Sequence, residues 1–129
     1  DGYSSVFTTL LDADLPVLVI RDTPATGEPT PTCVADAGED YTDCDGTRTD
    51  WLTADPAVDA VDELDSPRLR LVDLTDRICA GEVCGAVNGG VITYFDASHI
   101  TATYAYTLGP YLAPSIEAML AGAAQDKKG

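Results

Sequence analysis

The hydrophobic positions near the start of the chain form a helical stripe followed by one short continuous run, and a second apolar segment recurs near residue 70. Residues 1–11 carry their apolar side chains at the i, i+4 spacing that places them on one face of a helix. Residues 15–20 form a continuous apolar run. Because such a run is typical of a strand covered on both faces, we predict here a strand of a parallel sheet with helices on each side. Leu69, Leu71 and Val72 predict a second short strand.

A second helix is expected to begin at Asp55 and Pro56, since an aspartate cap followed by a proline suits the first turn of a helix. We expect this helix to continue over residues 57–64. Its inward stripe is predicted at Val58, Val61 and Leu64.

The C-terminal part of the chain is predicted to be helical with one interruption. A helix over residues 102–108 meets Gly109 and Pro110, which are expected to end it because proline lacks the backbone N–H. Apolar residues then predict a new helix over 114–120. Residues 122–129 are expected to form a flexible tail, which leaves residues 1–121 as the folded portion.

A tight turn and a short strand precede the only histidine of the chain. Asn88 and Gly89 are typical of a hairpin turn, because both residue types tolerate a positive φ. The predicted strand 91–95 then leads into a polar turn that contains Asp96 and His99. An aspartate three residues before a histidine can accept from one ring nitrogen and leave the other free as a base. The alternative is a solvated histidine without chemistry, since this spacing alone is a weak signal.

The four cysteines fall into two local pairs, Cys33 with Cys44 and Cys79 with Cys84. Neither pair has the short spacing of a zinc knuckle, and the histidine is far away in sequence, so we expect no metal site. Two loop-closing disulfides explain the pattern better than four free thiols, and they imply an oxidising compartment. Each would stabilise the chain by about 2 to 3 kcal/mol at most on the chain-entropy model.

The charge of the chain excludes some classes of partner. Its 129 residues suffice for one domain with a modest core, and the hydrophobic content of 45% is ordinary for a globular protein. A formal charge of -15 repels phosphate backbones and anionic lipid, which argues against binding to nucleic acid or to a membrane surface. No apolar run approaches the roughly 18 to 20 residues that cross a bilayer.

Four sequence blocks come in a characteristic order. They are Val-Ile-Arg-Asp-Thr-Pro at 19–24, Val-Asp-Leu-Thr-Asp-x-Ile-Cys at 72–79, the Cys79–Cys84 pair, and Tyr-Phe-Asp-x-x-His-Ile-Thr-Ala-Thr-Tyr at 94–104. In this order they resemble the C-terminal half of the SGNH-hydrolase-like domain that is fused to the membrane acyltransferase-3 fold in bacterial O-acyltransferases. The resemblance covers most of residues 5–120, and its last block is the most specific.

The resemblance implies a three-layer αβα, flavodoxin-like fold with a mostly parallel sheet, here lacking its N-terminal strands. It implies that Asp96 and His99 are two members of a Ser-Asp-His triad. The implied activity is acyl transfer, or ester hydrolysis, on a cell-surface glycan or glycolipid, with acetyl as the expected acyl group. The domain would lie outside the cytoplasm, tethered to the membrane through its parent protein, and would need neither a metal nor a cofactor.

One block of that family is missing from these residues. No Gly-Asp-Ser occurs in the sequence, and Asn88 is better explained as a turn residue than as an oxyanion donor. We therefore expect the N-terminal half of the same domain to supply the serine and to cover the open edge of the strand at 17–20. The alternatives are a non-catalytic module that binds a glycan or a partner protein on a degenerate SGNH scaffold, and a secreted structural domain.

Overall fold

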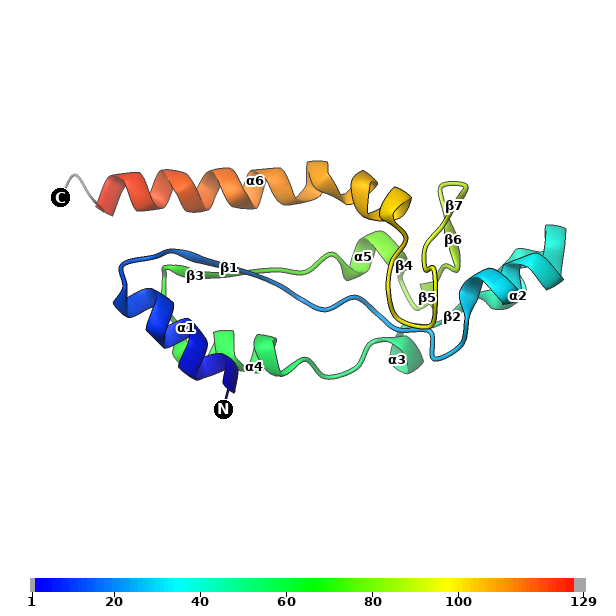
Figure 1. Ribbon diagram of the computed structural model, residues 1–129, viewed down its shortest axis with the longest axis horizontal. Helices are drawn as coiled ribbons and strands as arrows, with labels where there is room; N and C mark the ends of the chain where they lie inside the picture. Colours follow the sequence, from blue (N-terminus) through cyan, green and yellow to red (C-terminus); the bar gives the residue numbers. More distant parts are fainter. Residues whose placement is uncertain (1, 127–129) are drawn as a thin grey trace. The chain divides into compact units, whose positions relative to one another are not determined.

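The computed structural model describes residues 2–126, in which helices alternate with short strands (Figure 1). The chain divides into two compact units. Unit 1 takes the described residues of 1–21, 55–73 and 110–129, and unit 2 takes residues 22–54 and 74–109. The chain passes from unit 1 to unit 2 just after each of its two longest strands, so the loops that follow these strands belong to unit 2.

The sheet of unit 1 consists of two parallel strands, β1 (Val17–Ile20) and β3 (Leu69–Val72). Their register places Val17 opposite Leu69 and Ile20 opposite Val72. Both expected strands are present, although β1 begins at Val17 rather than at residue 15, and their parallel pairing agrees with the parallel sheet expected for residues 15–20.

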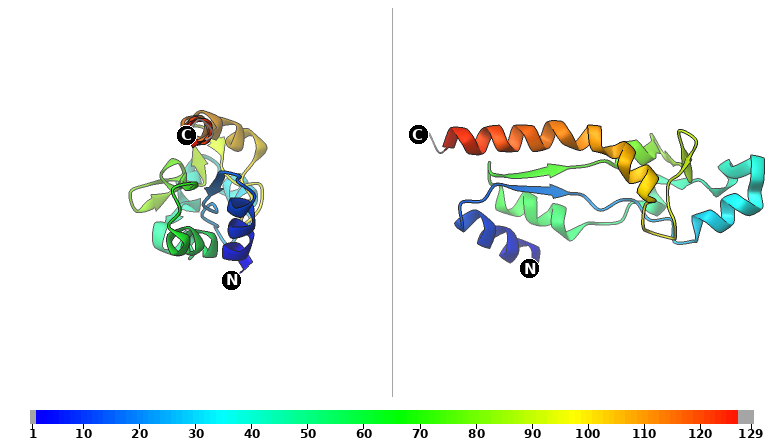
Figure 2. Two further views of the ribbon diagram at one scale, coloured as in Figure 1. Left: turned by 90° about the vertical axis from the view of Figure 1, so that its left-hand side faces the viewer. Right: turned by 45° about the horizontal axis from the view of Figure 1, so that its top comes forward.

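Two helices pack against one face of this sheet, α1 (Gly2–Asp12) and α4 (Pro56–Leu64). Figures 1 and 2 show both helices on the same side of β1 and β3. Apolar side chains from all four elements form the core of unit 1. Its buried members are Phe7, Val19, Ala57, Ala60 and Leu69.

The predicted start of α4 is confirmed, but its predicted inward stripe is displaced. The Asp55 side chain accepts a hydrogen bond of 2.8 Å from the Ala57 N–H and so caps the helix. Ala57 and Ala60 are the buried residues of α4, with Val61 and Leu64 packed against the same core, whereas the predicted Val58 is not part of it. The packed residues follow the i, i+3, i+4, i+7 spacing of one helical face, and Val58 lies about 100° away from that face.

The long C-terminal helix is continuous where the sequence predicts an interruption. Helix α6 runs from Ala102 to Asp126, with Pro110 and Pro114 inside it, so the predicted break at Gly109 and Pro110 is wrong. A proline removes one backbone donor and bends a helix, but packing of the flanking turns can retain the helix across it. The Thr101 hydroxyl accepts from the Tyr104 N–H at 3.1 Å and so caps the start of α6.

The helix also continues past Gly122, where the sequence predicts a flexible tail; residues 127–129 of that expected tail lie outside the described residues. Among residues 2–126, no helix combines the length and the hydrophobicity that crossing a membrane requires.

Unit 2 is built from short elements that two disulfides hold together. Its helices are α2 (Thr30–Ala37), the 3-10 helix η1 (Gly38–Cys44), α3 (Arg48–Trp51) and α5 (Thr75–Ile78), together with residues 102–109 of α6. Its strands are β2 (Gly46–Thr47), β4 (Cys79–Ala80), β5 (Val83–Cys84), β6 (Val87–Asn88) and β7 (Val91–Ile92). The expected cysteine pairs are confirmed, with disulfides joining Cys33 to Cys44 and Cys79 to Cys84. The first connects α2 to the end of η1, and the second connects β4 to β5.

The sheets of unit 2 are antiparallel, in contrast to the mostly parallel sheet that the resemblance implies. The strand order is β2-β5-β4 in one sheet and β6-β7 in the other. Gly89 and Gly90 adopt positive φ values of 58° and 79°, which confirms the predicted hairpin turn. The strand expected at 91–95 is shorter than predicted, because β7 ends at Ile92 and the following residues pair with the next loop.

Candidate active site

The turn that holds the only histidine is organised by one carboxylate. The Oδ1 atom of Asp96 accepts hydrogen bonds from the backbone N–H groups of Ser98 at 2.8 Å and His99 at 2.7 Å. Its Oδ2 atom lies 2.7 Å from Nδ1 of His99. An aspartate that binds backbone donors two and three residues ahead forms a local turn that needs no distant partner. The spacing of these two residues therefore brings their side chains together, as the sequence suggests.

The same hydrogen bonds stabilise the ionised form of the aspartate. The backbone N–H of His99, then that of Ser98, then the side chain of His99 lower the pKa of Asp96 from 3.8 to about 2. Asp96 is thus ionised at neutral pH and can only accept hydrogen bonds. A neutral imidazole facing it carries its proton on Nδ1, which leaves the lone pair of Nε2 available as a base.

The imidazole is open to solvent. The His99 side chain is 71% exposed and the Asp96 side chain 41%. Among residues 2–126, the side-chain hydrogen bonds of His99 involve Nδ1 and leave Nε2 without a hydrogen-bond partner. The interpretation of His99 as a base requires this exposure, because a ring buried in the core could not meet a substrate.

A loop from a distant part of the sequence supports this turn. The loop that follows β1 places the N–H groups of Thr26 and Gly27 at 2.8 and 3.2 Å from the carbonyl oxygen of Ala97, within the Asp96–His99 turn. The Thr26 hydroxyl lies 3.1 Å from the same oxygen. Figure 1 shows these two segments side by side in unit 2. Hydrogen bonds from the loop after β1 therefore stabilise the turn, in addition to the hydrogen bonds within the turn itself.

A buried tyrosine connects the same two segments. Tyr94 is fully buried, and its hydroxyl donates to the carbonyl oxygen of Pro24. Burial raises the pKa of Tyr94, and the nearby Tyr104 and Asp22 raise it further, so the hydroxyl keeps its proton and remains a donor. The edge of the Trp51 ring meets Tyr94 with ring centroids 5.8 Å apart. Tyr94 thus anchors the residues that immediately precede Asp96 to the core of unit 2.

Sequence reasoning missed two residues that contact the turn, Thr26 and Phe95. Thr26 is one of several polar residues in a loop, and nothing local shows which carbonyl group it binds. The ring of Phe95 stacks on the imidazole of His99, with centroids 5.6 Å apart and planes inclined by 23°. A signal for Phe95 was present in the alternation of strand side chains, because Phe95 must point away from the core if Tyr94 points into it.

The remaining polar candidates have other roles. The Asn88 amide donates to the Gly85 carbonyl oxygen at 2.9 Å and to Thr93 Oγ1 at 2.8 Å, so it holds the hairpin turn together. The Ser98 hydroxyl lies 3.4 Å from Nδ1 of His99, the nitrogen that already faces Asp96, and is not positioned as a nucleophile for Nε2. Within residues 2–126, no group of three or more His, Cys, Asp or Glu side chains is arranged to hold a metal ion.

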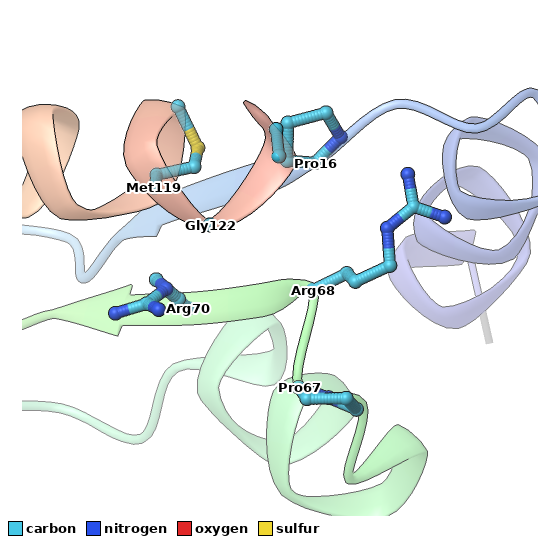
Figure 3. A pocket seen from close by; sticks show the side chains of 7 residues that line it. Pro16, Pro67, Arg68, Arg70, Met119 and Gly122 are labelled. Carbon is cyan, nitrogen blue, oxygen red and sulfur yellow. The ribbon is translucent and has the colours of Figure 1, made fainter. Parts of the chain in front are cut away.

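Unit 1 contains a small cavity, shown in Figure 3, between β3, the start of β1 and the C-terminal part of α6. Its lining residues are Pro16, Pro67, Arg68, Arg70, Met119, Gly122 and Ala123. The volume of about 30 Å³ has room for about one water molecule. The cavity lacks an acid–base pair, and the turn of Asp96 and His99 remains the candidate site.

The parallel strands and packed helices of unit 1 and the short helices and antiparallel strands of unit 2 make this a protein of mixed α and β structure. The chain matches the family described as SGNH domain (fused to AT3 domains) over residues 1–114. It therefore belongs to the family of SGNH domains that are fused to AT3 domains. No curated protein and no solved structure matches the chain.

Proposed function

We propose that this chain supplies the acid–base half of an extracytoplasmic serine O-acyltransferase or esterase domain. The main observation behind this proposal is the geometry of the turn, in which Asp96 Oδ2 lies 2.7 Å from His99 Nδ1 and the His99 side chain is 71% exposed. This is the arrangement in which an aspartate orients a histidine as a general base toward a serine hydroxyl. Membership of the SGNH family supports the same chemistry.

In the proposed reaction, Nε2 of His99 takes the proton of the serine hydroxyl as the serine oxygen attacks the acyl carbonyl of the donor. The donor's leaving oxygen then receives that proton, and a serine ester remains. In the second half, Nε2 takes a proton from an acceptor hydroxyl, whose oxygen attacks the ester, and returns the proton to the serine. Asp96 stabilises the imidazolium that forms in each half.

The serine is proposed to come from the N-terminal half of the same domain, since the present sequence holds no Gly-Asp-Ser. Such a segment would also complete the sheet of unit 1, in which β1 pairs only with β3 among the described residues and Ile20 is 49% exposed. Helices on both sides of that sheet in Figure 2 are compatible with the three-layer, flavodoxin-like arrangement.

The proposed setting is the outer side of a membrane. Fusion to AT3 domains in the family supports a membrane acyltransferase domain as the partner that delivers the acyl group. The two disulfides are compatible with an extracytoplasmic location, where they persist. We propose a cell-surface glycan or glycolipid as the acceptor and acetyl as the acyl group.

The test uses the parent protein in its membrane, with acylation of the acceptor glycan measured by mass spectrometry. His99→Ala should reduce acylation by about 10³-fold or more. Asp96→Asn should reduce acylation by up to about 10⁴-fold, because an asparagine at this position favours the wrong tautomer of the His99 imidazole. Asp62→Asn is the matched control, since it removes an exposed carboxylate on α4 and should leave acylation unchanged. Unchanged acylation in His99→Ala would refute the proposal.

The absence of a serine block favours one second candidate, a non-catalytic module that binds a glycan or a partner protein. The two functions predict different sequences upstream of Asp1. An intact Gly-Asp-Ser block there supports the enzyme, whereas a degenerate block supports the binding module. A binding module also predicts that His99→Ala leaves glycan acylation in the cell unchanged.

A further inference from the structure

Phe95 lies beside the candidate base and contributes almost nothing to the core. Its neighbour Tyr94 is 0% exposed, whereas the Phe95 side chain points outward and is 60% exposed. Exposing a phenyl ring costs free energy that a polar residue would avoid. The ring makes one aromatic contact within the described residues, the stack on His99.

The contacts of His99 show what this ring does. The hydrogen bond between Nδ1 and Asp96 holds the imidazole at one edge, and rotation about that contact still allows the plane of the ring to tilt. The Phe95 ring lies nearly parallel to the imidazole in an offset stack, with centroids 5.6 Å apart and planes inclined by 23°, and this contact opposes such a tilt. With 71% of the His99 side chain exposed, few other groups restrain it.

We propose that Phe95 is a positioning residue, whose ring holds the imidazole plane of His99 so that Nε2 keeps a single direction toward the reacting hydroxyl. This role rests on the proposed acyl-transfer function for its catalytic consequence. The claim that Phe95 restrains the orientation of the imidazole depends only on the stacking contact between the two rings. It can therefore be tested without measuring any reaction.

The side chain of Phe95 can be changed without dismantling the turn. The hydrogen bond that links Phe95 to the turn uses its backbone N–H, which donates to the His99 carbonyl oxygen at 2.9 Å. The Asp96 contacts to Ser98 and His99 are likewise independent of the phenyl ring. Substitutions at this exposed position are therefore expected to leave the fold intact.

The experiment compares Phe95→Leu, which keeps apolar bulk without a ring, with Phe95→Tyr, which keeps the ring. Tyr106→Leu is the matched control, because Tyr106 is an aromatic residue of unit 2 that is 87% exposed. His99 is the only histidine of the 129 residues, so its side-chain torsions can be followed by NMR couplings and nuclear Overhauser contacts in histidine-labelled protein.

We expect one dominant His99 rotamer in the wild-type chain, in Phe95→Tyr and in Tyr106→Leu, and rotamer averaging in Phe95→Leu. In the parent protein, Phe95→Leu should lower kcat for acyl transfer by about 2- to 12-fold, the range that corresponds to one aromatic pair, with KM unchanged. Phe95→Tyr should retain the wild-type kcat.

A single unchanged rotamer in Phe95→Leu would overturn the positioning role, whatever the activity. A rise in KM with kcat unchanged would also overturn it, since the ring would then serve in binding. The outcomes are separable from those of the proposed function: if His99→Ala leaves acylation unchanged, the acyl-transfer role fails while the rotamer measurement still decides whether Phe95 orients the ring.

Discussion

Removing one hydroxyl group tests how the candidate site is anchored to unit 2. The Tyr94 hydroxyl donates to the carbonyl oxygen of Pro24 across 70 positions of sequence, and both residues are fully buried. Tyr94→Phe retains the ring and its edge contact with Trp51 but removes the donor. The Pro24 oxygen then stays buried without this hydrogen bond.

A buried acceptor that loses its hydrogen bond costs about 1 to 3 kcal/mol, more than the net value of a typical hydrogen bond. We therefore expect the free energy of unfolding to fall by about 2 kcal/mol in Tyr94→Phe. For a urea dependence of about 2 kcal/mol per molar, this loss lowers the unfolding midpoint by about 1 M. Because Pro24 leads into the loop that binds the Ala97 carbonyl, the Thr26 amide should also exchange its hydrogen faster.

The fluorescence of Trp51 is a suitable probe, since it is the only tryptophan of the 129 residues and its ring contacts Tyr94. Tyr106→Phe is the matched control. This substitution also removes a tyrosine hydroxyl, but from a side chain that is 87% exposed. The free energy of unfolding of Tyr106→Phe should therefore change by less than about 0.5 kcal/mol. Equal midpoints for Tyr94→Phe and Tyr106→Phe would refute the reasoning.

Three further predictions concern the stability of unit 2. The pKa of Asp96 is lowered from 3.8 to about 2, so its ionised form stabilises the folded chain above pH 3.8 and this contribution is lost as the pH falls toward 2. The difference in urea midpoint between the wild type and Asp96→Asn should become smaller as the pH falls from 3.8 toward 2. A difference that stays constant over this pH range would show that ionisation of Asp96 does not stabilise the fold. In Gly46→Ala the new Cβ would lie 2.0 Å from Nε1 of Trp51. We therefore expect the free energy of unfolding to fall by about 1 to 3 kcal/mol and the fluorescence emission maximum of Trp51 to shift. Wild-type values of both quantities would show that the Trp51 ring moves aside without cost. Replacing Cys33 and Cys44 by serine should lower the free energy of unfolding by about 2 to 3 kcal/mol, measured by urea unfolding as above. Free thiols in the unreduced wild-type protein would contradict the presence of this disulfide.

Residue spacing alone predicted the features that depend on neighbouring positions. The strand 69–72 agrees with β3, and the Asp55 cap begins α4 where expected. The contact between Asp96 and His99 was also predictable, because a carboxylate that binds backbone donors within three residues needs only its local turn.

Only the tertiary structure decided how that turn is supported and which residues surround the imidazole. Thr26 and Ala97 are separated by 71 positions, and their hydrogen bond depends on how the loops after the strands return to each other. The continuity of α6 through Pro110 likewise depends on packing, which can outweigh the local cost of a proline. Local hydrogen bonds follow from spacing along the chain, whereas contacts between distant loops exist only once the chain has closed.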